Sequence, residues 1–124
     1  MSAPESISEA ESAVLAVLWE KGTATAEDVA AALAKPRGWQ DSTVKTLLGR
    51  LLRKGAARAE KDGRRFIYSP TLAREDWLSQ ESDSLLDRLY GGRVAPLVAH
   101  FSRHRKLSKR DIRELKQLIG ELDE

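Results

Sequence analysis

The stretch QDSTVKTLLGRLLRKG, which runs from Gln40 to Gly55, decides the fold because it separates into two unlike helical faces. At 100° per residue one face is aliphatic, while the other holds small and cationic side chains and no carboxylate after Asp41. The aliphatic face contains Val44, Leu47, Leu48 and Leu51, with Leu52 at its edge. The opposite face contains Ser42, Lys45, Thr46, Gly49, Arg50 and Arg53. We expect a helix that Asp41 caps, that runs to Lys54 and that ends at Gly55.

The cationic face differs from an ordinary solvated helix surface in two respects. Solvated faces usually mix Glu with Lys, because oppositely charged pairs at i,i+4 stabilise a helix, whereas this face has no acid. Gly49 lies in mid-helix, where glycine costs about 1 kcal/mol relative to alanine. A helix that enters a groove gains a closer backbone approach from that glycine, so the face favours contact with double-stranded DNA.

Side-chain chemistry suggests different roles along this face. Lys45 and Arg50 are candidates for hydrogen bonds to guanine O6 and N7 in the major groove. Arg53 and Lys54, near the helix end, are expected to contact phosphate. The short side chains suited to a phosphate or to a thymine methyl group are Ser42, Thr43 and Thr46.

Two helices are predicted before this one and a hairpin after it. The helix boundary residues are Ser8, Glu11 and Gly22 for the first helix, and Thr25, Asp28, Pro36 and Gly38 for the second. Two short strands follow, at about Ala57–Glu60 and Arg65–Ser69, joined at Asp62-Gly63, a strong hairpin signal. The hairpin tip supplies the cations Lys61, Arg64 and Arg65. Beside a cationic third helix, such a tip is suited to phosphate or to the minor groove.

The order of these elements predicts the fold class. Three helices and a hairpin within residues 1–70 form the order of a winged helix-turn-helix, whose third helix enters the major groove while the hairpin lies against the backbone. Helical signals return at Ala73–Tyr90, Val94–Ser102 and Lys109–Leu122, the last capped by Ser108 and Asp111. We predict a mainly α fold with a small β-hairpin wing, comprising an N-terminal winged-helix DNA-binding domain (1–70) and a C-terminal helical dimerisation domain (71–124).

The C-terminal helices are expected to pair with a second copy of the chain. Three helices in about 50 residues bury too little surface to close a core, and residues 1–70 look self-sufficient. The candidate dimerisation residues recur at helical spacing and are Leu85, Leu89, Leu97, Val98, Phe101, Ile112, Leu115 and Ile119. A two-fold homodimer calls for a pseudo-palindromic operator with half-sites spaced by whole helical turns. Trp77 and Tyr90 are expected to be core or interface aromatics.

Charge and composition narrow the class of protein. The formal net charge is +2 over 124 residues, but residues 1–36 carry −4, residues 37–70 carry +6 and the rest is neutral. A central basic island of this kind indicates contact with a polyanion. Cysteine is absent, which excludes disulfides and thiolate metal sites. We expect a cytoplasmic protein, because neither a targeting segment nor an apolar run of about 20 residues appears.

Other interpretations remain open. His100 and His104 stand at the i,i+4 spacing that can chelate a divalent metal, but Arg103 and Arg105 beside them oppose a cation, so no metal site and no cofactor are predicted. An enzyme is not expected, since no nucleophile–base pair, phosphate loop or carboxylate cluster appears. The alternative from another class is a winged-helix protein–protein interaction module whose basic face docks an acidic partner.

Several stretches together resemble a known family. These are AESAVLAVLWEKGTATAEDV (10–29), DSTVKTLLGRLLRKG (41–55), FIYSP (66–70) and LYGGRVAPLVAHF (89–101). From about Ile7 to Leu122 the chain resembles the penicillinase repressor family, the BlaI, MecI and CopY group of bacterial winged-helix repressors. The resemblance implies a homodimeric repressor of genes for β-lactam resistance, copper handling or a neighbouring membrane metalloprotease. Its operator would be bound through the helix over residues 40–54 and the wing over residues 57–69.

The resemblance also assigns residues. Family DNA contacts carry over to Thr43, Lys45, Thr46 and Arg50, whereas better-known members have a lysine where this chain has Ser42. Antibiotic-responsive members are relieved by proteolysis at an Asn–Phe bond, with a membrane sensor metalloprotease as partner. That bond corresponds to His100-Phe101, where histidine replaces asparagine. Copper-responsive members carry a cysteine-rich tail, which this cysteine-free chain lacks, so thiolate copper sensing is excluded.

Overall fold

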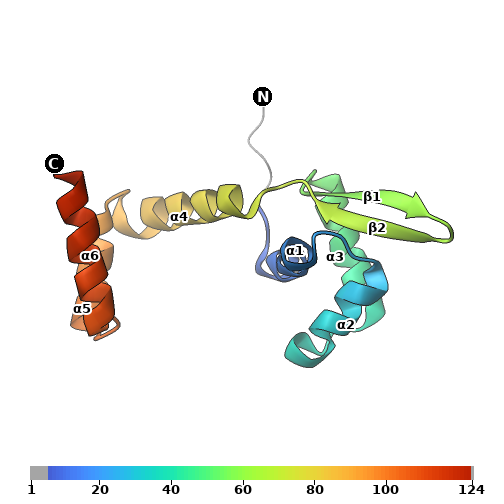
Figure 1. The fold of residues 1–124 in the computed structure, drawn as a ribbon, viewed down its shortest axis with the longest axis horizontal. Coiled ribbons are helices and arrows are strands. Elements are labelled where there is room, and N and C mark those ends of the chain that lie inside the picture. Colours follow the sequence, from blue (N-terminus) through green and yellow to red (C-terminus); the bar gives the residue numbers. More distant parts are fainter. Residues whose placement is uncertain (1–5, 124) are drawn as a thin grey trace. The chain divides into compact units, whose positions relative to one another are not determined.

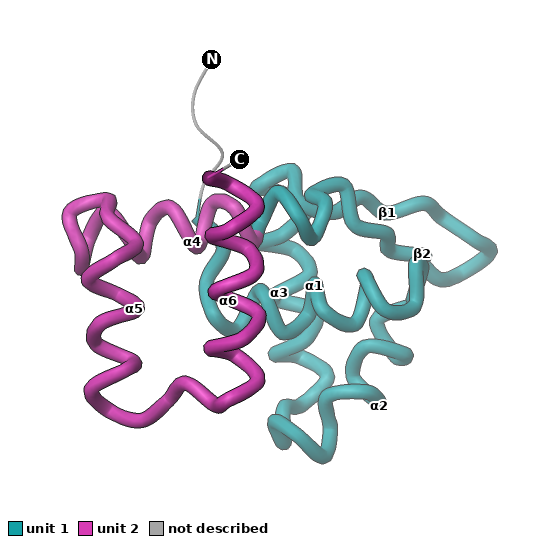
Figure 2. The backbone as a smooth tube through the Cα atoms, turned by 60° about the vertical axis from the view of Figure 1, so that its left-hand side comes forward, with its two compact units in different colours: residues 1–77 teal, residues 78–124 magenta. Residues whose placement is uncertain are grey.

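The computed structural model describes residues 6–123, which form two compact units divided between Trp77 and Leu78 (Figure 2). The elements follow one another as α1 (Glu9–Lys21), α2 (Ala26–Arg37), α3 (Asp41–Arg53), β1 (Ala57–Asp62), β2 (Arg65–Pro70), α4 (Arg74–Tyr90), α5 (Val94–Arg103) and α6 (Lys109–Leu122) (Figure 1). This order confirms the predicted fold class, a mainly helical chain with a single hairpin between its third and fourth helices.

Capping boxes begin α1 and α2 as the sequence predicts. The Glu11 N–H donates to Ser8 Oγ at 3.1 Å, and the Ser8 N–H donates to Glu11 Oε1 at 2.8 Å. Thr25 and Asp28 exchange the corresponding bonds, both at 3.0 Å. Gly22 ends α1 with φ +82°, a conformation that favours glycine. These local bonds satisfy the free N–H groups at the helix starts and fix where each helix begins.

The predicted cap of α3 is wrong. Asp41 is the first helical residue, and Gln40 occupies the N-cap position without a side-chain hydrogen bond. The helix ends at Arg53, Lys54 takes the C-cap position, and Gly55 follows with φ +73°. The carboxylate of Asp41 still lies in the first turn, where a negative charge complements the helix dipole.

The hairpin is longer than predicted and turns one residue later. β1 and β2 pair antiparallel from Ala57 opposite Pro70 to Asp62 opposite Arg65, which leaves Gly63-Arg64 as the two turn residues in place of Asp62-Gly63. Gly63 has φ +65°, so the positive φ falls on the first turn residue, as in a type II′ turn. The Tyr68 N–H and carbonyl also bond to Ala24, at 2.8 and 3.0 Å, which ties the α1–α2 loop to the wing.

The core of the first unit lies between α1, α2, α3 and the base of the hairpin. Its largest fully buried side chains are Leu15, Leu18, Leu48, Leu51, Val14, Val29, Val44 and the carboxylate residue Glu11. The predicted aliphatic face of α3 is buried as expected, except that Leu52 at its edge is 37% exposed. Burial of this face orients α3, because its opposite side must then face outward.

The first unit extends past residue 70, where the sequence placed the domain boundary. The Trp19 indole N–H donates to the Leu72 carbonyl at 2.9 Å, and the Trp19 and Trp77 ring centroids lie 5.5 Å apart. The Thr71 hydroxyl donates to the Gly55 carbonyl at 2.5 Å. The first turn of α4 therefore belongs to the first unit, and Trp77 packs against its core.

The second unit contains the rest of α4 with α5 and α6. Its last helix begins at the predicted capping box, in which the Asp111 N–H donates to Ser108 Oγ at 3.0 Å. None of residues 78–123 is buried; Leu89 is 62%, Ile119 57% and Leu122 84% exposed. A hollow of about 270 Å³ between α5 and α6 is lined mostly by apolar side chains, together with Asp111 and Glu114. Across residues 6–123, no helix combines the length and apolar character needed to cross a membrane.

Candidate nucleic-acid interface

The predicted cationic face of α3 is accessible over its whole length. Gly49 is half-buried, and the remaining side chains of this face are exposed, namely Ser42, Lys45, Thr46, Arg50 and Arg53. Thr43, beside this face, is exposed as well. The aliphatic side chains on the other side of α3 hold the helix against α1 and α2. The structure therefore presents a continuous surface of small and positively charged groups on one helix.

Packing among residues 6–123 does not require a glycine at position 49. A β-carbon at this position would meet only Arg53 Nη1, at 3.7 Å, which is an ordinary van der Waals contact. The backbone here is helical, so glycine is not needed for its conformation either. An alanine would stabilise the isolated helix by about 1 kcal/mol. The α3 backbone at Gly49 is therefore open to close approach from outside the chain.

The hydroxyl of Thr46 is already engaged within the helix. Thr46 Oγ1 donates to the Ser42 carbonyl at 2.9 Å, so its hydrogen is used and its oxygen lone pairs and methyl group remain free. Thr46 is thus suited to a thymine methyl or to a donor on the partner, and less to donating to phosphate. A shallow hollow of about 250 Å³ lies here, lined by Ser42, Thr43, Thr46, Leu47 and Arg50.

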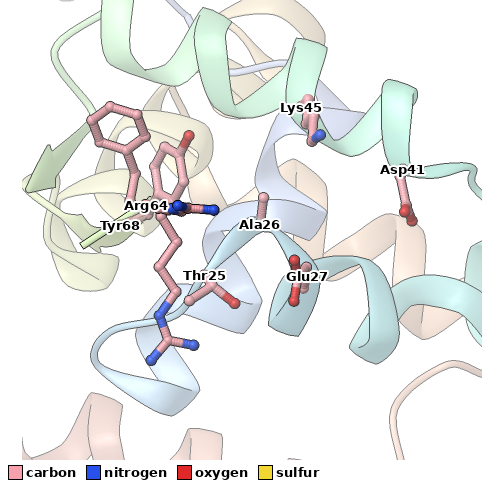
Figure 3. A pocket seen from close by; sticks show the side chains of 9 residues that line it. Thr25, Ala26, Glu27, Asp41, Lys45, Arg64 and Tyr68 are labelled. Carbon is pink, nitrogen blue, oxygen red and sulfur yellow. The ribbon is translucent and has the colours of Figure 1, made fainter. Parts of the chain in front are cut away.

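A larger hollow of about 410 Å³ lies between the start of α2, α3 and the wing (Figure 3). Lys45 of α3 lines it together with Arg64 and Arg65 of the wing, about 20 residues further along the chain. Glu27 and Asp41 contribute two carboxylates to the same lining. The fold thus gathers cations from the helix and the wing around one concave surface, as a polyanion backbone requires. Lys61 is exposed but lies outside this hollow.

Phe66 and Tyr68 complete the lining of this hollow and were missed by the sequence predictions. They alternate on β2, so they share one face of the hairpin, and Phe66 is 48% exposed. Tyr68 packs against the core, which leaves Phe66 as an apolar surface beside the wing arginines. The period-two alternation in residues 65–70 was the available signal. An exposed aromatic next to cations is suited to a deoxyribose or a base face.

Lys54 does not belong to the exposed cationic face, contrary to the prediction of a phosphate contact. Its ammonium donates to Glu11 Oε1 at 2.6 Å and to the Ser6 carbonyl at 2.8 Å. Glu11 is 1% exposed and the Lys54 side chain 19%. Burial alone would raise the pKa of Glu11, but hydrogen bonds from Lys54 and from the Ser8 N–H outweigh it, so the net pKa of the Glu11 carboxyl is lowered.

Arg65 of the wing lies close enough to the start of α2 to act on the carboxylate of Asp28. The pKa of Asp28 is lowered, first by the hydrogen bonds from Thr25 and further by the charges of Lys21 and Arg65. Arg65 therefore lies near the α2 N-terminus as well as in the hollow with Lys45. The cations near the start of α2 come from three separate segments of the chain, namely Lys21 from α1, Lys45 from α3, and Arg64 and Arg65 from the wing.

The candidate dimerisation residues lie on the second unit, largely uncovered. Leu97, Val98, Phe101 and Leu115 line the hollow between α5 and α6. The positions that are exposed within the single chain are Leu85, Leu89, Phe101, Ile112 and Ile119. Exposed apolar side chains contribute little to the stability of the folded chain unless another apolar surface covers them.

His100 and Phe101 lie inside α5, with ring centroids 5.8 Å apart. The bond between them is helical, whereas proteases bind extended segments, so cleavage here would require that α5 unwind locally. The rings of His100 and His104 are 4.4 Å apart. Within the part of the chain that the structure describes, no three His, Asp or Glu side chains are grouped so that they could hold a metal ion.

The fold and this surface define the class of the protein as a winged-helix DNA-binding protein. A model of the penicillinase repressor family matches residues 7–121. The penicillinase repressor of Bacillus licheniformis is 36% identical over 115 residues, which cover 93% of this chain and 90% of that protein. The methicillin resistance regulatory protein MecI of Mammaliicoccus sciuri is 30% identical over 114 residues, which cover 92% of this chain and 93% of that protein.

Solved structures agree with these relatives. The DNA-binding domain of the repressor BlaI has a TM-score of 0.55 at 36% identity and covers 61% of this chain and 93% of its own. Bacillus licheniformis BlaI in its monomeric form, in complex with the blaP half-operator, gives a TM-score of 0.53 at the same identity and coverage. The chain belongs to the penicillinase repressor family, a family of DNA-binding transcriptional repressors and not of enzymes. This confirms the resemblance inferred from the sequence.

Proposed function

We propose that this chain is a homodimeric transcriptional repressor that binds a pseudo-palindromic operator through α3 and the wing. The observation that carries the proposal is the cationic face of α3, which has no carboxylate after Asp41 in its first turn and which shares a hollow with the wing arginines through Lys45. The complex of BlaI with the blaP half-operator supports this assignment, since that protein has the same fold at 36% identity. A repressor must reach the chromosome, so we place the protein in the cytoplasm.

In this proposal α3 lies in the major groove and the wing lies on the backbone. Lys45 and Arg50 project from the exposed face of α3, where long cationic side chains reach guanine O6 and N7. Arg53 at the helix end and Lys61, Arg64 and Arg65 on the wing neutralise phosphates. Residues Ser42, Thr43 and Thr46 face the groove, and Gly49 allows the α3 backbone to approach the DNA closely.

Dimerisation is assigned to the second unit. Across α4, α5 and α6 no residue beyond the first unit is buried, although eight large apolar side chains there are at least a third exposed. A second copy of the same surface is the simplest cover, because two-fold pairing matches each apolar patch with an identical one. Such a dimer presents two copies of α3, as an inverted repeat requires.

Relief of repression is assigned to proteolysis in the second unit. Cleavage at His100-Phe101 would separate α6 and the end of α5 from the rest of the chain. Phe101 also lines the proposed dimer surface, so its loss from the dimer would weaken pairing directly. A membrane sensor metalloprotease is the proposed upstream partner. Exposure of a purified dimer to such a protease, with mass measurement of a fragment that ends at His100, tests this step.

The central experiment measures binding to duplex DNA over a range of salt concentrations. We expect binding to inverted-repeat DNA from the chain's own promoter, with an affinity that falls steeply with salt because several phosphates are neutralised. A control duplex of the same length and random sequence should bind more weakly. Absence of salt-dependent duplex binding, together with binding to an acidic protein, would favour the alternative of a protein-interaction module on the same basic face.

Arg50 gives the sharpest residue-level test. Arg50→Ala should weaken binding to the operator by about 1–3 kcal/mol and relax preference at one base position, because a bidentate contact to guanine is lost. The matched control is Lys116→Ala, which removes an exposed cation from the second unit. Equal losses on operator and random DNA would contradict the assignment of Arg50 to base reading.

A further inference from the structure

The C-terminal end of α3 is joined to the start of α1 by an ion pair that lies inside the first unit. Lys54 Nζ and Glu11 Oε1 are 2.6 Å apart and come from positions 43 residues apart in the chain. We infer that Lys54 and Glu11 are positioning residues, which set how α3 is presented to DNA without touching it. The inference rests on the proposed function and adds residues to its DNA-reading site.

The Glu11–Lys54 pair joins the start of α1 to the end of α3. Its Oε1 accepts the Ser8 N–H at 2.8 Å, which begins α1, and the Lys54 ammonium, which lies at the C-cap of α3. The same ammonium donates to the Ser6 carbonyl at 2.8 Å, in the segment that precedes α1. These bonds are directional, so they allow one position of the α3 end relative to α1. The aliphatic contacts along the rest of α3 are less restrictive, because apolar contacts are not directional.

The burial of the pair shows that it is not a surface contact. Glu11 is 1% exposed, and removal of water from a carboxylate is unfavourable unless a cation and hydrogen bonds compensate. Apolar side chains of similar volume could stabilise the same space equally well. The ion pair therefore fixes the position of the α3 end relative to α1 more than it raises the free energy of unfolding. The ammonium at the helix C-terminus also complements the negative end of the α3 dipole.

The neighbouring residue shows the contrast in roles. Arg53 is exposed on the DNA-facing side and forms no ion pair within residues 6–123, whereas Lys54 faces inward. One step of about 100° along the helix separates the two directions. The two neighbouring cations can therefore be compared directly. Arg53 should contact phosphate, whereas Lys54 should affect DNA binding only through the position of α3.

The test compares full-length variants Lys54→Met, Glu11→Gln and the double variant with Arg53→Met as the matched control. Methionine keeps the apolar stem of lysine or arginine without its charge, and the amide oxygen introduced by Glu11→Gln can still accept the Ser8 N–H. We expect Lys54→Met to lower the Tm by more than about 10 °C, because the Glu11 charge is left unpaired. The decrease in Tm of the double variant should be smaller than the sum of the decreases of the two single variants.

DNA binding, measured below the lowest Tm, separates positioning from contact. Lys54→Met should reduce the ratio of operator to random-sequence affinity about tenfold, comparable to one base contact, and leave the salt slope unchanged. Arg53→Met should lower the salt slope by about one and affect both duplexes alike. If Lys54→Met does not fold, Glu11→Gln supplies the same comparison with a milder perturbation.

Three outcomes are distinguishable. A salt slope that falls by about one in Lys54→Met would overturn the inference and make Lys54 a phosphate contact. A lowered Tm with an unchanged affinity ratio in both Lys54→Met and Glu11→Gln would overturn it in favour of a purely stabilising pair. A wild-type protein that binds no duplex would instead refute the proposed function, which this inference requires.

Discussion

The two units of this chain bury their apolar side chains to very different extents. The first unit encloses leucines that are fully buried, such as Leu15 and Leu48, whereas residues 78–123 contain no buried side chain at all. Each unit contains a strongly amphipathic helix, α3 or α6, and a helix that begins with a capping box, α1 or α6. The difference lies in the number of faces available for packing, since α1, α2, α3 and the hairpin close on one another within a single chain. The first unit is thus equipped to fold alone, while the second lacks a cover of its own.

The largest expected effect tests the core of the first unit. Leu48→Ala should lower the free energy of unfolding by about 2–5 kcal/mol, because a fully buried leucine is replaced by a cavity. Leu52→Ala, on the same helix but 37% exposed, is the control and should lose far less. Denaturant unfolding measures both. Equal losses would contradict the assignment of Leu48 to a closed core.

A charge on the second unit should break the dimer and spare the first unit. Ile119→Asp places a carboxylate in the proposed interface, so the dimer should weaken by about 2 kcal/mol or more, as expected at an interface hot spot. Gln117→Asp, an exposed polar position of the same helix, serves as the control. Analytical ultracentrifugation follows the dimer, and near-ultraviolet circular dichroism follows the tryptophans of the first unit. An undisturbed dimer in Ile119→Asp would place the interface elsewhere.

Truncation locates the boundary between the units. A chain ending at Leu78 should fold as a monomer and be more stable, by about 2 kcal/mol, than a chain ending at Pro70. The reason is that the longer form keeps Trp77 against Trp19 and the bond from Trp19 to the Leu72 carbonyl. Thermal unfolding compares the two fragments. Equal stability would return the boundary to residue 70, and a dimeric fragment would contradict the division of roles between the units.

The smallest expected effect compares one glycine in each unit. Gly49→Ala and Gly120→Ala should each stabilise their helix by about 1 kcal/mol, because neither added β-carbon meets a close neighbour. Only Gly49→Ala should weaken operator binding, since it alone lies on the DNA-facing side of α3. Thermal unfolding and fluorescence anisotropy with labelled operator measure the two effects. Unchanged operator affinity in Gly49→Ala would contradict the proposal that Gly49 lets the α3 backbone approach the DNA closely.

Local signals predicted most of the elements and their limits. The Ser8–Glu11, Thr25–Asp28 and Ser108–Asp111 boxes each begin the helix that they predicted, because a capping box involves residues only three apart. The errors concern the first residue of α3 and the position of the hairpin turn. Asp41 was placed at the cap instead of the first turn, and the hairpin turn shifted by one residue. A one-residue shift of this kind depends on strand pairing, which the turn residues alone do not decide.

The candidate interface could be predicted only in part. The six residues of the α3 face follow from helical periodicity, and the five with side chains are exposed, in agreement with it. Phe66 was missed, although it alternates with Tyr68 on β2, because its exposure depends on how far the wing extends beyond the core. Lys54 was assigned to the wrong side, because its partner Glu11 lies in another helix.

The sequence alone determined the helices, the hairpin, the aliphatic and cationic faces of α3 and the family, since each depends on residues close together in the chain. Only the tertiary structure decided which charges meet. It directs Lys54 to Glu11, brings Arg64 and Arg65 to the hollow that Lys45 lines, and packs Trp77 on Trp19. Such contacts depend on the crossing of helices and on strand register, and a few ångströms of displacement would replace one partner by another or by water.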